Sequence, residues 1–95
     1  MSSELEQQAV LCGIDACERL AVRLADLIAQ HEHAASMARA DWTGPHHDTF
    51  EERVAALRHD LEAGRTWVVR LRHEAELRLD ELRAQAALLR MTGAR

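Results

Sequence analysis

Apolar side chains recur at alternating intervals of four and three residues along most of this chain. The first series covers residues 10–38, and the second covers residues 50–75 and continues to residue 89 after one extra four-residue step. This spacing places a narrow apolar stripe, called here the seam, along an α-helix, and it is typical of helices that pack together. The extra step is a stutter, which locally unwinds a supercoil. The seam positions are Val10, Ile14, Cys17, Ala21, Leu24, Ile28, His31, Ala35 and Ala38, followed by Phe50, Val54, Leu57, Leu61, Gly64, Val68, Leu71, Ala75, Leu79, Leu82, Ala86 and Leu89.

Residues 41–46 are the only internal stretch with the residue types of a turn. Gly44 tolerates positive φ, and Pro45 suits the first turn of a helix, where its missing N–H is not needed. Thr43 or Gly44 is the expected cap of the following helix. A connection this short makes the helices antiparallel neighbours. We therefore expect one all-α domain over residues 1–95, a two-helix hairpin with helices at about 3–40 and 46–91, a turn at 41–45 and a short tail at 92–95.

The composition agrees with helices and argues against several classes of partner. A single proline and four glycines leave little to interrupt a helix, and 3% aromatic residues imply a core of Leu, Ala and Val. The 16 acidic and 12 basic residues are interspersed, so neither nucleic acid nor an anionic membrane is an expected partner. No run approaches the ~18 apolar residues of a membrane span, and the polar start differs from a cleaved signal peptide. We expect synthesis in the cytoplasm.

No residue pattern predicts catalysis, a cofactor or a metal site. Cys12 and Cys17 stand about 7.5 Å apart along a helix, too far for an unstrained disulfide. His31 occupies a seam position, where a hydrogen bond is expected rather than a metal. Glu74 and Arg78 are placed to form an i,i+4 ion pair. A two-helix rod offers no concave pocket, so we expect a protein that is not an enzyme. The remaining histidines are expected on the helix surface and are His33, His46, His47, His59 and His73.

The flanks of the two seams are apolar as well. Two helices cannot enclose a core, and exposed apolar stripes of this size mark an interface. The sequence therefore predicts a dimer, or a complex with a larger partner, that forms a four-helix bundle. Three of its expected interface residues flank the seams, namely Leu20, Leu27 and Trp67. The others, Leu77, Leu88 and Met91, form a further stripe with Ala84 on the far side of the second helix.

With the turn placed, the chain resembles the WXG family of small type VII (ESX) secretion proteins. The resemblance spans the length and architecture of the chain and is carried by Trp42 and Gly44 at the hairpin turn, with the aromatic Phe50 eight residues after the tryptophan. It implies a protein that is secreted without a cleaved signal peptide, or one that accompanies a larger substrate. The implied partner is a second copy, another WXG-like hairpin or the helical domain of a larger substrate, and the secretion ATPase is a further implied partner.

One departure from the family concerns its export signal. Many members carry Tyr-x-x-x-Asp/Glu after the second helix, and this chain has no tyrosine. A looser family pattern fits Leu77, Glu81, Ala84 and Leu88, which makes these four residues a candidate export signal. The alternative is a plain partner-facing stripe in which Glu81 pairs with Arg78. Two other functions stay open, namely a non-secreted cytoplasmic adaptor or chaperone hairpin for an exported toxin, and an unrelated structural coiled-coil module.

Overall fold

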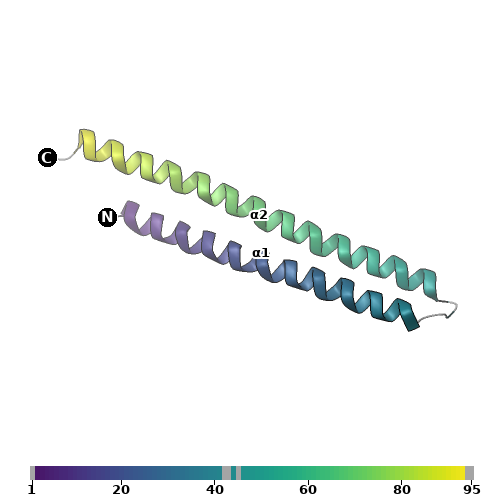
Figure 1. The fold of residues 1–95 in the computed structure, drawn as a ribbon. Coiled ribbons are helices and arrows are strands. Elements are labelled where there is room, and N and C mark those ends of the chain that lie inside the picture. The colour runs from purple at the N-terminus through teal and green to yellow at the C-terminus, as the bar shows by residue number, and fades with distance from the viewer. Residues whose placement is uncertain (1, 42–43, 45, 94–95) are drawn as a thin grey trace.

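The computed structural model describes residues 2–41, 44 and 46–93. Its two helices are α1, Ser2–Asp41, and α2, His47–Thr92, and they lie side by side in opposite directions (Figure 1). No strand occurs within these residues. The predicted all-helical hairpin is confirmed, and each helix end lies one residue from its expected position.

The hairpin is a long, thin rod. Its Cα atoms extend over 77 × 15 × 14 Å, and the radius of gyration is 21.6 Å. The start of α1 and the end of α2 lie at the same end of the rod, where α2 continues past α1 (Figure 1). The final turns of α2 therefore have no neighbouring helix within the chain.

The seam of α1 is placed as its spacing predicts. Every one of its nine predicted positions, from Val10 to Ala38, is half-buried or buried. The buried hydrophobic side chains of the described residues are Ala35, Val68, Leu79 and Leu82. A core this narrow is what two helices can form, because each helix covers only one stripe of the other.

The predicted seam of α2 is wrong at three positions. Leu57, Leu71 and Leu89 are exposed, while Arg72 is half-buried in place of Leu71. Leu57 and Leu71 lie at the margin of the interhelical contact, where a single partner helix does not reach around them. Leu89 lies eleven residues after Arg78, which contacts Glu6 near the start of α1, so α1 does not reach its level.

Polar contacts between the helices define their register. Arg58 Nη2 lies 3.0 Å from Glu32 Oε1, and Arg78 Nη2 lies 3.5 Å from Glu6 Oε2. Interpolation between these two pairs along antiparallel helices places Gly64 level with Leu24. Folding the two predicted seams about residues 43–44 also sets Gly64 near Leu24, so the sequence predicts the same register.

The entry into α2 differs from the expected cap. The N-cap residue is His46, with φ −97° and ψ 16°, and it makes no side-chain capping hydrogen bond. Backbone groups close the turn instead, because His47 N donates to Gly44 O at 3.2 Å and Phe50 N donates to His46 O at 3.0 Å. The residues of the expected turn motif at Trp42, Thr43 and Pro45 lie outside the described residues.

Candidate helix-packing interface

The seam divides the surface of the hairpin into two lateral faces with different chemistry. Each residue of an α-helix is rotated by 100° about the helix axis from the one before it. By this measure, five large apolar residues are rotated by about 20–100° from the centre of the seam on their own helix, all toward the same side of the hairpin. We call this side the apolar face, and its residues are Leu20, Leu27, Leu57, Trp67 and Leu71. Their exposed fractions lie between 40% and 61%, so the hairpin alone leaves roughly half of each in solvent.

The opposite side, the charged face, carries ion pairs that bridge the helices. Arg39 pairs with Glu51, and Arg58 pairs with Glu32 and with Glu62. The hydrogen bond from Arg39 lowers the pKa of the Glu51 carboxyl below its ordinary value, against a smaller opposing effect of desolvation. These carboxylates and guanidinium groups satisfy one another, whereas the buried Nε atom of Arg72, two heptads after Arg58 on the same side, has no hydrogen-bond partner among the described residues.

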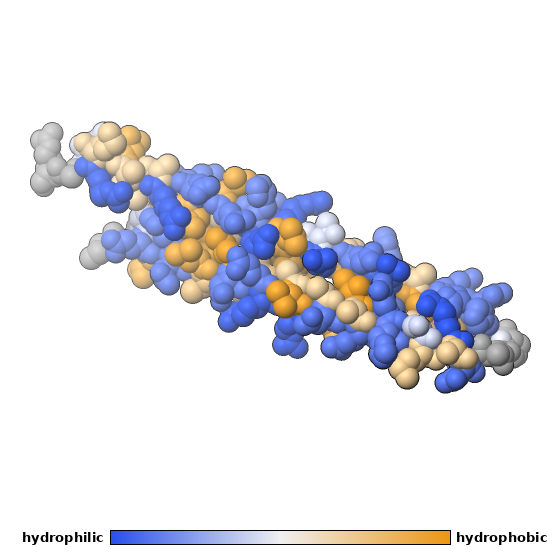
Figure 2. Space-filling view, viewed as in Figure 1, coloured by the Kyte–Doolittle hydropathy of each residue, from blue (hydrophilic) through white to orange (hydrophobic). Residues whose placement is uncertain are grey.

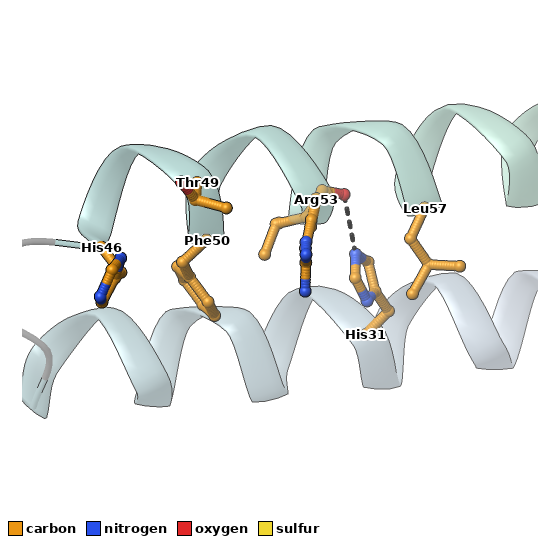
Figure 3. Close-up of a pocket in the computed structure, with 7 residues that line it drawn as sticks. His31, His46, Thr49, Phe50, Arg53 and Leu57 are labelled. Carbon is orange, nitrogen blue, oxygen red and sulfur yellow. Dashed lines mark hydrogen bonds between the residues drawn. The ribbon is translucent and has the colours of Figure 1, made fainter.

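A groove of about 470 Å³ opens on the apolar face beside the turn (Figure 3). Phe50 projects from α2 toward α1, and His31 rises from α1 to meet α2. The His31 Nε2 atom lies 3.2 Å from the carbonyl oxygen of Val54, which confirms the expected hydrogen bond at this seam position. The lining contains no carboxylate and is formed by His31, His46, Thr49, Phe50, Arg53, Val54 and Leu57.

Three charged residues on the apolar side of α2 have no ion-pair partner among the described residues. Arg53 lines the groove, and Asp60 and Glu74 follow at the same heptad position further along the helix. The expected pair between Glu74 and Arg78 is wrong, because the Arg78 guanidinium contacts Glu6 at 3.5 Å and Glu81 at 3.0 Å instead. Sequence reasoning did not single out Arg53, since its lack of a partner becomes visible only once the other ion pairs are placed.

Gly64 lies in the seam of α2, but the structure gives no reason within the hairpin for a glycine at this position. A Cβ atom built at Gly64 would meet nothing within 4 Å, so the packing of α1 against α2 does not require a glycine there. Glycine inside a helix costs about 0.5–1 kcal/mol relative to alanine. Its placement at the margin of the apolar face leaves room for another helix to approach closely.

The predicted interface residues divide into two separate surfaces. Leu20, Leu27 and Trp67 come together on the apolar face. The other group lies on the side of α2 that points away from α1 and consists of Leu77, Ala84, Leu88 and Met91. Met91 is 83% exposed. Figure 2 shows hydrophobic side chains in orange reaching the surface between blue hydrophilic ones along the rod. One partner helix cannot cover both surfaces.

The candidate export signal lies on this outer side of α2. The Glu81 carboxylate accepts a hydrogen bond from Arg78 Nη1 at 3.0 Å, and the Glu81 side chain is 63% exposed. The alternative expectation, an ordinary surface pair between these two residues, is confirmed as a contact. Glu81 is therefore held in place within the chain but remains accessible from solvent.

The described residues contain neither a metal site nor a membrane-spanning helix. Within residues 2–41, 44 and 46–93, no group of three or more His, Cys, Asp or Glu side chains is placed to hold a metal ion. Over the same residues, neither helix has a stretch apolar enough to cross a bilayer. Cys12 is exposed, Cys17 is half-buried, and both thiols are free.

Comparisons with protein-family models, with curated proteins and with solved structures found no significant match for this chain.

Proposed function

We propose that this chain is a WXG-like type VII secretion protein that acts by pairing with another helical hairpin and not by catalysis. It serves either as a secreted substrate or as the partner of a larger substrate. The observation that carries the proposal is a Trp-x-Gly tripeptide, Trp42 to Gly44, between two helices of 40 and 46 residues. The turn sequence, the two long helices and the near-central position of the turn together support it.

The surface of the hairpin supports the pairing part of this proposal. The buried hydrophobic side chains of the described residues number only four, and the apolar face exposes five large ones. Covering that face with two further helices would give each α-helix a second neighbour, as in a four-helix bundle. Isolated two-helix rods with such a thin core depend on a partner for much of their stability.

The secretion part is tested by following the protein out of the cell that makes it. We expect the chain to accumulate in the culture medium of the wild-type strain and to remain in the cell when the secretion ATPase carries an inactivating substitution. A cytoplasmic enzyme measured in the same medium controls for lysis. A chain that stays in the cell while a bound toxin-like protein is exported would replace the proposal with the adaptor function.

The candidate export signal is tested in the same assay by Glu81→Ala. The exposed pair with Arg78 contributes at most about 1 kcal/mol, so helicity by circular dichroism should not change. We also expect export to continue, because the chain lacks the tyrosine of the fuller signal and a partner is the better carrier of it. Loss of export with unchanged helicity would instead identify Glu81 as part of the signal.

A further inference from the structure

We propose that the groove beside the turn binds a small aromatic carboxylate. The floor of the groove holds the flat apolar body of this molecule, and the rim of the groove on the solvent side holds its carboxylate. A single hairpin supplies the whole site, because every lining residue belongs to this chain. The inference is independent of pairing and of secretion, and it adds a ligand that the proposed function does not require.

The floor of the groove is apolar. At 100° per residue, Phe50 and Leu57 are rotated by only about 40–60° from Val54, which lies on the side of α2 that faces α1. The carbonyl oxygen of Val54 is already bonded, because His31 Nε2 lies 3.2 Å from it (Figure 3). The floor therefore offers carbon surface together with the ring of Phe50, and a flat apolar molecule packs well against an aromatic ring.

The rim of the groove carries hydrogen-bond donors. Thr49 and Arg53 are rotated by about 100–140° from Val54 toward solvent, and they stand four residues apart, so their side chains are neighbours on the helix surface. Arg53 has no ion-pair partner among the described residues. A guanidinium group binds a carboxylate through two parallel hydrogen bonds, and the Thr49 hydroxyl can donate a third. The rim is therefore suited to one carboxylate group.

Two acidic residues stand near the groove on the same side of the hairpin. Asp60 follows Arg53 by seven residues, which is about 10.5 Å along α2, and Asp41 ends α1 about one helical turn from the level of Arg53. Both are exposed, and neither lines the groove. Solvent and salt screen exposed charges over about 8 Å at physiological ionic strength, so these carboxylates oppose a bound anion only weakly.

The size and lining of the groove define the class of ligand. Its volume of about 470 Å³ lies within the usual range of small-molecule sites, which are mostly apolar and use a few polar groups to orient the ligand. One guanidinium group without a carboxylate in the lining favours an anion with a single charge over a polyanion. An anion without an apolar body would gain nothing from the floor. An aromatic carboxylate uses both parts of the site.

The ligand class is tested on the full chain with two matched probes, 2-naphthoate and its neutral amide, 2-naphthamide. We expect 2-naphthoate to shift the backbone amide resonances of His31 and of residues 46–57, with a dissociation constant below about 1 mM. The neutral amide should bind at least about tenfold more weakly, because it has the same ring system but no charge for Arg53 to pair with. Both constants are measured by titration followed by nuclear magnetic resonance.

Three variants separate the rim from the floor. Arg53→Gln should remove the preference for 2-naphthoate, whereas the matched control Arg70→Gln, at an exposed position on the outer side of α2, should keep it. Leu57→Ala should weaken both probes equally, and the fold should tolerate it because Leu57 is 49% exposed.

Three results would overturn the inference, namely equal affinity for the two probes, an unchanged preference in Arg53→Gln, or resonance shifts spread evenly over the exposed leucines of both helices. A chain that is exported but binds neither probe overturns only this inference. A chain that binds 2-naphthoate but neither pairs nor leaves the cell overturns only the proposed function.

Discussion

His31 forms a hydrogen bond between the two helices near the turn. A carbonyl oxygen only accepts hydrogen bonds, so the 3.2 Å contact with Val54 O requires the Nε2 atom to carry a proton. A hydrogen bond to one particular carbonyl fixes the axial position of α1 against α2 more tightly than an apolar contact does. A polar residue in an otherwise apolar seam therefore contributes specificity of register.

Substitution of His31 should separate the hydrogen bond from the packing. We expect His31→Asp to destabilise the hairpin by about 1–3 kcal/mol, because a carboxylate would face the Val54 carbonyl without a donor between them. His31→Leu exchanges one hydrogen bond for apolar burial and should change stability by less than about 1 kcal/mol. Urea unfolding followed by circular dichroism measures both, and equal losses in the two variants would contradict this role.

Glu51 makes stability depend on acid pH through its contact with Arg39. The folded state lowers the pKa of this carboxyl, so its contribution to stability is complete above the ordinary value of 4.5 and disappears as the pH falls through the lowered value. We expect Glu51→Gln to lower the melting temperature at neutral pH and to have a smaller effect at an acid pH below the ordinary value of 4.5. A difference between variant and wild type that is the same at both pH values would show that charge is not the cause.

At the scale of the helices, the four-three spacing was sufficient to predict both elements and the whole seam of α1. It was not sufficient for Leu57 and Leu71, because spacing gives the angular position of a residue but not how far a single partner helix reaches around it. The lengths of the two helices explain the error at Leu89. The flanks Leu20, Leu27 and Trp67 were predicted as interface residues from the same spacing, and their assembly on one face follows from the direction of packing.

A pair of leucines on α2 distinguishes packing within the hairpin from packing between chains. Leu82 is 3% exposed and Leu88 is 60% exposed. We expect Leu82→Ala to cost about 2–4 kcal/mol of unfolding free energy, whereas Leu88→Ala should cost less than about 0.5 kcal/mol. Thermal unfolding of both variants at one protein concentration makes the comparison, and a similar loss for Leu88→Ala would mean that its side chain is covered in the assembled protein.

At the scale of the whole molecule, the two lateral faces have opposite roles. The charged face pairs Arg39 with Glu51 and Arg58 with Glu32 across the helices, and the apolar face leaves its leucines and Trp67 half-exposed. Covering the apolar face with a further helix would therefore bury more apolar surface than covering the charged face.

The elongated shape also determines which openings the folded chain can pass. A compact globule of the same length would have a radius of gyration of about 12 Å, and hence a diameter of about 32 Å. The rod has a radius of gyration of 21.6 Å, but its Cα atoms span only 15 × 14 Å in cross-section. With side chains included, two adjacent helices measure about 20–25 Å across at the widest. A channel of that bore would admit the hairpin end-on with its helices intact and would exclude a rounder protein of equal mass.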